Sequence, residues 1–205
     1  MTEMLEHNTD TEQAVRDAFA RMVKYQEGQD FKRILKAGWL ESPVGVMFAI
    51  GDDEHLYMLS YINQSSLERK AALVQRKLQA NLEMGSCAAI TSITGEMKEY
   101  FKGEREYFET PVGLLGTSFQ VRVWEELRKI PYASTISYTE LAHRIEKPAA
   151  FRAVAQANAQ NPLSIVVPCH RIINTDGAIG GYNAGIERKR WLLDFEQSVL
   201  AREDE

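Results

Sequence analysis

The stretch Ser164-Ile-Val-Val-Pro-Cys-His-Arg-Ile-Ile173 largely decides how the second half of the chain is expected to fold. Residues 164–167 form a short apolar run that predicts a buried strand, and Ile172-Ile173 predicts a second one. Pro168 stiffens the backbone just before Cys169, because its ring fixes the φ angle. We therefore expect a short loop that carries the cysteine between two strands.

The residues around Cys169 favour a reactive cysteine over one that only fills the core. A lone cysteine is usually a small buried hydrophobe, and Cys87, beside two alanines and an isoleucine, fits that description. Cys169 is different, because His170 and Arg171 are potential cations that favour the nucleophilic thiolate. With two cysteines in all, a disulfide framework is excluded, and a reducing compartment would leave both thiols free.

Composition places the chain among ordinary globular proteins. Its 205 residues are 44% hydrophobic and 26% charged, which is enough for a normal core. No apolar run approaches the roughly 20 residues of a membrane span, and residues 1–10 are polar and acidic, unlike a signal peptide. We expect a cytoplasmic protein.

The net charge of -5 weighs against a nucleic-acid partner only if the charges are evenly spread. Between Thr117 and Glu196, ten Lys or Arg residues stand against eight Asp or Glu residues, which gives +2 and leaves -7 for the rest. An ordinary charged surface would produce the same mild asymmetry. Charge therefore neither establishes nor excludes a DNA partner.

The first 110 residues predict a helical extension followed by a small α/β unit. Residues 11–26 have helical spacing of apolar side chains, and Gly28 and Gly38 bracket a second short helix, so that residues 1–40 form an N-terminal extension of unassigned role. Residues 44–62 predict a hairpin around a turn at 51–53. A charged helix over 67–82 and a short helical piece over 97–101, ending near Gly103, complete the unit at 41–110.

Residues 111–205 predict three helices and the active loop. Apolar residues at helical spacing follow Pro111 in a helix that Pro131 ends. Ser137 with Glu140 forms a capping box for a helix over 138–145, and Pro148 suits the first turn of a helix that ends near residue 158. This is a helix-turn-helix outline, although three short helices also occur in many folds that bind no DNA.

The loop and its surroundings resemble a known family. Asn161-Pro162 followed by Ile165-Val-Val-Pro-Cys-His-Arg171 is similar to the active-site signature of the O6-alkylguanine-DNA alkyltransferases, also called methylated-DNA–protein-cysteine methyltransferases. Asp176-Gly-Ala-Ile-Gly-Gly-Tyr182 and Glu196 follow in the same order and spacing. The resemblance covers residues 111–196 strongly and 43–108 loosely. It implies a small ribonuclease-H-like sheet in an α/β N-terminal subdomain, and a mainly α C-terminal domain of winged-helix or helix-turn-helix type.

The resemblance also implies a reaction. Cys169 would accept the alkyl group of O6-alkylguanine, and of O4-alkylthymine, in double-stranded DNA. His170 would take the thiol proton through a water, Glu196 would orient and charge His170, and Asn161 would belong to the same network. Because a thioether is stable and no second thiol is placed to reverse it, each molecule would react once. No cofactor or metal is expected, and neither a membrane nor a second subunit is needed by such a monomer.

The lesion would have to leave the duplex to reach the thiol, which assigns further roles. The pocket around the extruded base would comprise Tyr138, Tyr182, Ile172, Asn183, Gly180 and Gly181. The DNA surface would comprise Arg152, Ala153, Ala157 and Ser137, with Arg152 filling the gap in the duplex and the alanines allowing close approach in a narrow groove. Phe151 and Ala184 depart from the family pattern, where smaller residues are common.

Three other functions fit parts of the sequence. A damage-binding relative would recognise the alkylated base without transferring anything, but such proteins lack the nucleophile that Cys169 supplies. A cysteine hydrolase could use Cys169 and His170, although Tyr138 and Arg152 would then match the family by coincidence. A plain helix-turn-helix regulator would have no use for the reactive loop.

Overall fold

A four-stranded sheet dominates the N-terminal half. The computed structural model describes residues 9–24 and 28–203. The strands are β1 Arg33–Leu40, β2 Met47–Gly51, β3 Leu56–Tyr61 and β4 Ala80–Met84. They lie in the order β3-β2-β1-β4, with β4 parallel to β1 and the other pairs antiparallel. The hairpin expected over 44–62 is confirmed as β2 and β3.

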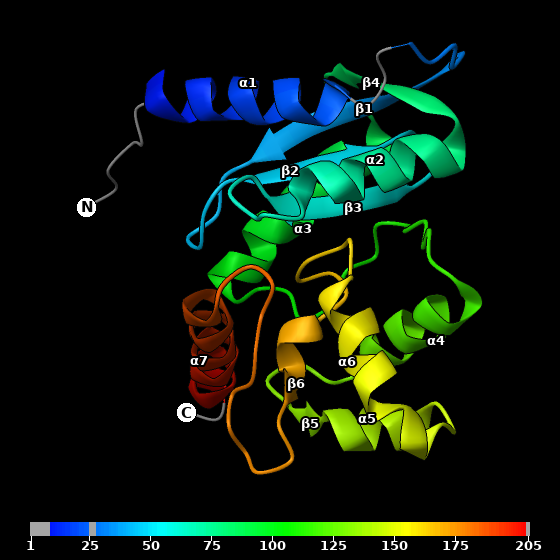
Figure 1. The fold of residues 1–205 in the computed structure, drawn as a ribbon. Helices are drawn as coiled ribbons and strands as arrows, with labels where there is room; N and C mark the ends of the chain where they lie inside the picture. Colours follow the sequence, from blue (N-terminus) through cyan, green and yellow to red (C-terminus); the bar gives the residue numbers. More distant parts are fainter. Residues whose placement is uncertain (1–8, 25–27, 204–205) are drawn as a thin grey trace.

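Helices cover both faces of this sheet. Helices α1 (Thr9–Val23) and α2 (Leu67–Leu78) pack together against one face, and α3 (Ala88–Lys102) packs against the other (Figure 1). Alternate residues of β2 belong to different cores: Phe48 and Ile50 face α1 and α2, while Met47 and Ala49 face α3. Because β2 and β3 are buried on both faces, their residues are mostly apolar.

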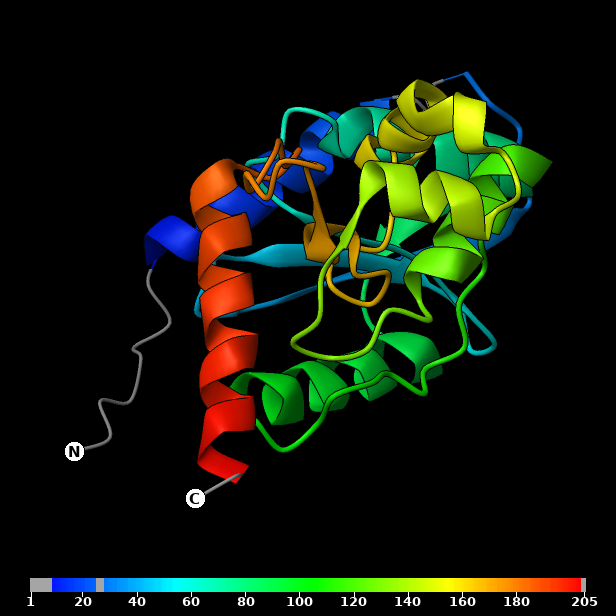
Figure 2. The same cartoon turned by 90° about the horizontal axis from the view of Figure 1, so that it is seen from below.

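The C-terminal half is mainly helical and shares a core with the sheet. Its elements are α4 (Ser118–Leu127), β5 (Ile136–Ser137), α5 (Tyr138–Arg144), α6 (Phe151–Ala159), β6 (Ile172–Ile173) and α7 (Ile186–Glu203). The end of α3 lies beside α7 in two views (Figures 1 and 2), and the ring of Phe101 contacts those of Trp191 and Phe195. Mixed sheet and helices therefore form one continuous body.

Local signals explain where several of these helices begin and end. The hydroxyl of Thr117 accepts from the N–H of Gln120, whose side chain accepts from the N–H of Thr117, so a full capping box starts α4. Ser137 caps α5 by accepting from the N–H of Glu140, as its position predicted. Gly103 ends α3 with a left-handed φ of 80°, which glycine adopts without strain.

Two predicted elements are wrong. Residues 28–38 do not form a helix: Arg33–Leu40 is β1, in which Leu35 and Ala37 are buried at the two-residue spacing of a strand. Residues 33–40 thus belong to the sheet and not to a separate helical extension. Residues 164–167 form a turn with an isolated bridge between Ser164 and Val167, because Ile165 has a left-handed φ of 72° that a strand cannot contain.

Other boundaries differ by a few residues. The helix over 67–82 ends at Leu78, because Gln79 turns left-handed and the chain enters β4. Helix α3 begins at Ala88, nine residues before the piece expected at Met97. Helix α1 agrees with its prediction, but the predicted end at Gln26 and residues 1–8 lie outside the described residues.

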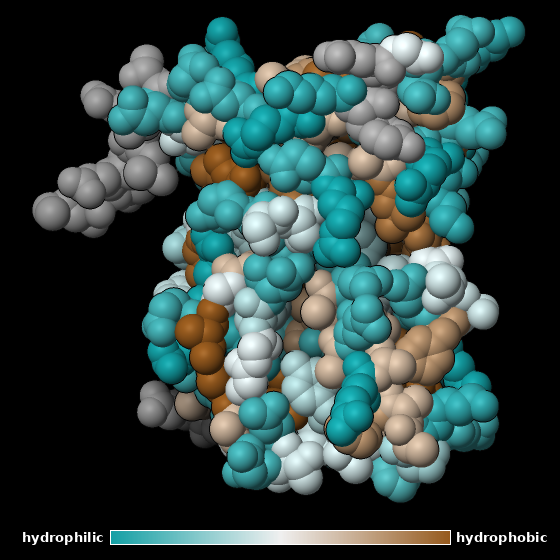
Figure 3. All heavy atoms as spheres, in the orientation of Figure 1, coloured by the Kyte–Doolittle hydropathy of each residue, from teal (hydrophilic) through white to brown (hydrophobic). Residues whose placement is uncertain are grey.

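The surface is mostly polar. Figure 3 shows a largely hydrophilic face with a few separate hydrophobic groups. The exposed large hydrophobic side chains include Phe151 at 45% and Trp191 at 37%. In the described part of the chain, every helix lacks the length or the apolar character that a membrane span requires.

The left-handed end of α2 predicts a stabilising substitution. Gln79 is exposed and has φ 48°, a conformation that costs a residue with a Cβ about 1 kcal/mol relative to glycine. Gln79→Gly should therefore raise the free energy of unfolding by about 0.5–1 kcal/mol, measured by urea denaturation. As a matched control, Lys77→Gly within the helix should lower it by about 1 kcal/mol. A loss of stability in Gln79→Gly would contradict the prediction.

Candidate active site

The loop that carries Cys169 is anchored to the edge of the N-terminal sheet. The N–H of Leu59 in β3 donates to the carbonyl of Pro162 at 2.9 Å, and the N–H of Ser164 donates to the carbonyl of Leu59 at 2.8 Å. The chain then turns through Ile165 and enters a 3-10 turn over Cys169–Arg171. Two backbone hydrogen bonds to β3 therefore fix the position of the chain just before the turn that carries Cys169.

Asn161 ties this loop to the sulfur. Its Nδ2 donates to the carbonyl of Val167 at 2.7 Å and to Sγ of Cys169 at 3.1 Å. Its Oδ1 accepts from the N–H of Leu163 at 2.9 Å. One buried amide therefore holds both sides of the loop and hydrogen-bonds the thiol, so the predicted association of Asn161 with Cys169 is present in the geometry.

Glu196 on α7 gathers the groups next to the cysteine. Its fully buried carboxylate contacts Nε2 of His170 at 2.9 Å and accepts from Nε and Nη2 of Arg171 at 2.9–3.3 Å. It also accepts from the hydroxyl of Tyr100 at 2.8 Å and from the N–H of Ala133 at 3.1 Å. Burial alone would raise the pKa of Glu196, but His170 and Arg171 hold it at about 2.

His170 is positioned through one ring nitrogen. The side chain is fully buried, and burial lowers its pKa below the usual value of 6.5. While Nε2 contacts Glu196, Nδ1 has no hydrogen-bond partner among the described residues. The structure therefore leaves one nitrogen of a neutral imidazole available to handle a proton.

The expected effect of neighbouring cations on Cys169 is not supported by this geometry. The guanidinium of Arg171 donates hydrogen bonds to Glu196 and to the carbonyl of Ile130, and burial favours the neutral form of His170. Burial raises the pKa of the Cys169 thiol; the amide of Asn161 and the ammonium groups of Lys70 and Lys189 act in the opposite direction. The cations predicted to act on the thiol from their position next to it in the sequence, His170 and Arg171, are therefore the wrong ones.

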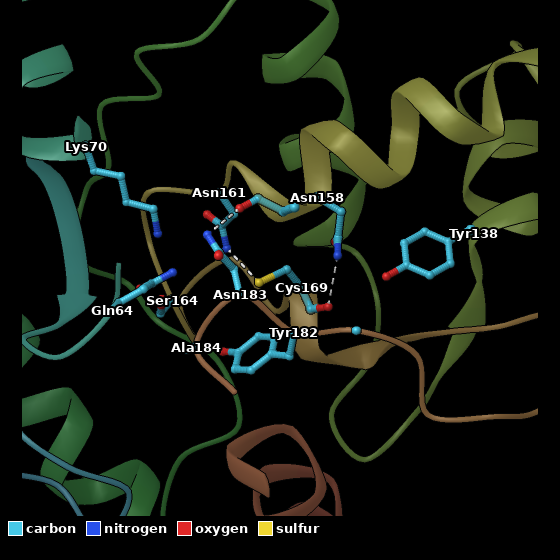
Figure 4. Close-up of a pocket in the computed structure, with 12 residues that line it drawn as sticks. Gln64, Lys70, Tyr138, Asn158, Asn161, Ser164, Cys169, Tyr182, Asn183 and Ala184 are labelled. Atoms are coloured by element: carbon cyan, nitrogen blue, oxygen red, sulfur yellow. Dashed lines mark hydrogen bonds between the residues drawn. The ribbon is translucent and has the colours of Figure 1, made fainter. Parts of the chain in front are cut away.

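A cavity of about 220 Å³ opens over the thiol. Figure 4 shows Cys169 between Lys70 and Gln64 on one side and Tyr138 on the other, with Tyr182 beside it. Its lining residues are Gln64, Lys70, Tyr138, Asn158, Ala159, Asn161, Ser164, Cys169, Gly181, Tyr182, Asn183 and Ala184. Four of the residues predicted for a base pocket, Tyr138, Gly181, Tyr182 and Asn183, are therefore gathered around the sulfur.

The structure leaves other predicted site residues away from this cavity. The carbonyl of Ile172 accepts a hydrogen bond from Lys189, and neither Ile172 nor Gly180 lines the cavity. Gly180 has φ 68°, and a Cβ there would approach Oδ1 of Asn174 to 2.9 Å. The local backbone and Asn174, and not the cavity, therefore require glycine at this position. Asn183 lines the cavity and also donates to Ser66 and to the carbonyl of Ala159.

The residues predicted to face DNA divide into two groups. Arg152 and Ala153 are exposed near the start of α6, and the guanidinium of Arg152 lies 5.6 Å from the ring of Phe151. Ala157 is 2% exposed, and its carbonyl accepts from the indole of Trp124. Packing of α6 against α4 places Ala157 on the core side, so close contact with a groove is the wrong explanation for that alanine.

Several cavity residues were missed in the sequence. Asn158, at the end of α6, donates to the carbonyl of Cys169 at 3.4 Å. Lys70 and Gln64 reach the cavity from the N-terminal half, about 100 residues away in sequence. No local pattern marks them, since Lys70 is one of several charged residues on α2. Among the described residues, no group of three or more His, Cys, Asp or Glu side chains is arranged to hold a metal ion.

The Glu196 cluster predicts a specific pH dependence. A folded pKa of about 2 lies below the ordinary 4.5, so the carboxylate stabilises the fold above about pH 4.5, and that stability is lost as the pH falls toward 2. Glu196→Gln should remove this acid-side loss and lower the free energy of unfolding at pH 7 by about 3 kcal/mol, because Arg171 is left without its partner. Glu187→Gln, exposed on the same helix, should change it by less than about 1 kcal/mol. Urea denaturation from pH 3 to 8 measures both; equal effects of the two substitutions would refute the assignment.

Comparisons with known proteins find similar sequences. A family model described as "6-O-methylguanine DNA methyltransferase, DNA binding domain" matches residues 118–198. The methylated-DNA–protein-cysteine methyltransferase of Methanosarcina barkeri is 35% identical over 162 residues, which cover 78% of this chain and 96% of the relative. The Mycobacterium bovis protein of the same name is 47% identical over 110 residues, covering 54% and 67% of the two chains.

Solved structures of similar fold are also found. The crystal structure of Mycobacterium tuberculosis OGT in complex with DNA matches with a TM-score of 0.69 and 36% identity, covering 80% of this chain and 94% of that one. The O6-methylguanine-DNA methyltransferase of Pyrococcus kodakaraensis matches with a TM-score of 0.59 and 25% identity, covering 79% and 98%. Because the Methanosarcina relative is matched over nearly its whole length, this chain belongs to the methylated-DNA–protein-cysteine methyltransferase family.

Proposed function

We propose that this protein repairs DNA by moving the alkyl group of O6-alkylguanine, and of O4-alkylthymine, onto Cys169. The observation that carries the proposal is the cysteine at the cavity, hydrogen-bonded by Asn161 and followed by the His170–Glu196 pair. Membership of the methyltransferase family supports the same reaction. A damage-binding protein without a nucleophile would have no use for this arrangement.

The proposed reaction is a single displacement. A lone pair of Sγ attacks the alkyl carbon, the bond from that carbon to O6 breaks, and the electron pair leaves with guanine, which takes up a proton from water. His170 receives the thiol proton at Nδ1 through a water, and Glu196 stabilises the imidazolium that results. The product is a thioether, so the protein reacts once and requires no cofactor or metal.

The cavity and α6 divide the remaining work. The lesion would be extruded from double-stranded DNA into the cavity, next to Tyr138 and Tyr182, because an alkyl carbon inside a duplex is out of reach. Arg152 would fill the vacated space, since it is exposed at the start of α6. Ala153 and Ser137 would lie near the DNA backbone, although the Ser137 hydroxyl also caps α5.

The architecture belongs to the same proposal. Residues up to about 110 would form the ribonuclease-H-like α/β subdomain, with β1 included, and residues 111–205 the winged-helix or helix-turn-helix-type domain. In support, α6 packs against both α4 and α5, and β5 pairs with β6. The chain would act as a monomer in the reducing cytoplasm, where Cys169 stays a free thiol.

The reaction predicts a mass change on one residue. Wild-type protein mixed with a duplex containing one O6-methylguanine should gain one methyl group on Cys169, and lesion loss should stop at one per molecule, followed by intact and peptide mass spectrometry. Cys169→Ala should be inert, while Cys87→Ser should react like the wild type. Binding without a mass gain would identify a damage sensor, and repeated turnover of esters or amides would identify a hydrolase.

Base extrusion predicts a difference between substrates. Arg152→Ala should slow repair of O6-methylguanine in a duplex at least tenfold, because the duplex must be opened, and should leave reaction with the free base almost unchanged. The control Arg122→Ala removes an exposed arginine from α4. Equal losses on both substrates would exclude the role given to Arg152.

A further inference from the structure

Helix α2 brings a buried lysine to the reactive cysteine. Lys70 is 5% exposed and lines the same cavity as Cys169, although it belongs to the N-terminal half. Figure 4 shows its side chain entering from the side opposite Tyr138, with the ammonium directed toward the centre of the cavity. A buried lysine in this position requires a physical explanation.

The hydrogen-bond partners of Lys70 do not neutralise its charge. Nζ donates to the hydroxyl of Ser60 at 3.3 Å, and that hydroxyl donates in turn to Oε1 of Gln64 at 2.6 Å. Within residues 9–24 and 28–203, no carboxylate forms an ion pair with Lys70. Because an unpaired buried cation is costly, burial lowers the pKa of Lys70 to about 8.

Of the cavity-lining groups that can become anions, Cys169 has the lowest ordinary pKa. The lining contains no Asp or Glu, and its ionisable members besides Lys70 are Cys169, Tyr138 and Tyr182. Burial raises the pKa of both tyrosines above the ordinary 10. The thiolate of Cys169 is therefore the anion that can compensate Lys70.

The second lysine near the sulfur is already engaged. Nζ of Lys189 donates to the carbonyls of Ile172 and Gly181. Lys70 lines the cavity and Lys189 does not, so Lys70 is the lysine that faces the cavity. Besides these two lysines and the Asn161 amide, Tyr61, Tyr138 and Tyr182 interact with the sulfur, and exposed Arg69 interacts with Lys70.

We propose that Lys70 is a positioning residue through which the N-terminal half stabilises the thiolate of Cys169 and so sets its reactivity at neutral pH. The inference rests on the proposed function for its DNA assay, but thiol reactivity tests it separately. Lys70 carries its charge below about pH 8 and loses it above, since its pKa is lowered to that value. Its effect should be full at pH 7 and should vanish toward pH 9.5.

The experiment compares substitutions of two lysines on the same helix. Lys70→Met keeps the length of the side chain and removes the charge, and Lys77→Met makes the same change at an exposed position of α2. All variants carry Cys87→Ser, so that Cys169 is the only thiol. Rates of alkylation by iodoacetamide, and of transfer from free O6-methylguanine and from the lesion duplex, are measured between pH 6 and 9.5. Circular dichroism checks folding.

At pH 7, Lys70→Met should slow all three reactions about three- to tenfold, because loss of thiolate is partly offset by the higher nucleophilicity of a more basic sulfur. The ratio to wild type should approach one at pH 9.5, and Lys77→Met should stay within about twofold of wild type throughout. Lys70→Arg keeps its charge at high pH, so it should stay faster than Lys70→Met at pH 9.5. This second variant tests the inference even if Lys70→Met does not fold.

Three results would overturn the inference. Lys70→Met could match Lys77→Met at pH 7, which would remove any effect on the thiol. A loss confined to the duplex would make Lys70 a DNA contact, and an equal loss at every pH would make its role structural. If the pH profiles of the iodoacetamide reaction follow the expectation but the wild type removes no methyl group from O6-methylguanine, the inference stands and the proposed repair function fails.

Discussion

A carboxylate without access to water must find its hydrogen-bond donors inside the protein, and Glu196 finds them in three other segments. Tyr100 donates from α3, Ala133 from the chain before β5, and Arg171 from the turn that also presents His170. Each donor is needed, because a buried charge that loses a partner costs several kcal/mol. Helix α7, α3 and the active loop are therefore fixed relative to one another by a single side chain.

A second set of hydrogen bonds fixes the part of the active loop that precedes Cys169. Ile165 adopts a left-handed φ of 72°, which costs a β-branched residue on the order of 1–3 kcal/mol. That conformation persists because the backbone pairs with Leu59 on one side and with the Asn161 amide on the other. The sulfur is thus placed before any substrate arrives, and binding need not order the loop.

The sequence predicted the features that depend on local or linear information. The hairpin of β2 and β3 follows from apolar runs around a turn, and the start of α5 follows from Ser137 and Glu140. The association of Cys169, His170, Glu196 and Asn161 came from the family resemblance, because no spacing rule joins residues 161 and 196. Between Gly28 and Gly38 the prediction failed, since the two-residue periodicity of a short strand is easily missed between glycines.

The burial of individual side chains on α6 and the charged partners of the thiol could not be predicted, because they depend on tertiary contacts. The exposure of Ala153 and the burial of Ala157 are decided by how α6 packs on α4, where Trp124 donates to the carbonyl of Ala157. Arg171 stands next to His170 in sequence, yet it serves Glu196, while the cations that act on the thiol are Lys70 and Lys189. His170 and Arg171 both contact Glu196 although they follow Cys169 directly in the chain, so sequence neighbours are a poor guide to electrostatic partners.

The contribution of Lys70 explains why the two halves share one core. If the C-terminal half acted alone, Pro162 and Ser164 would lose their backbone partners in β3, and the cavity would lose Lys70 and Gln64. The hydrogen bond from Asn183 to Ser66 also joins the two halves beside the cavity. Cys169 therefore depends on the N-terminal half in two ways, through the backbone of β3 that places the sulfur and through the charge of Lys70 on α2. A buried thiol is otherwise driven toward its neutral form, so the charge of Lys70 offsets the electrostatic cost of burying the sulfur.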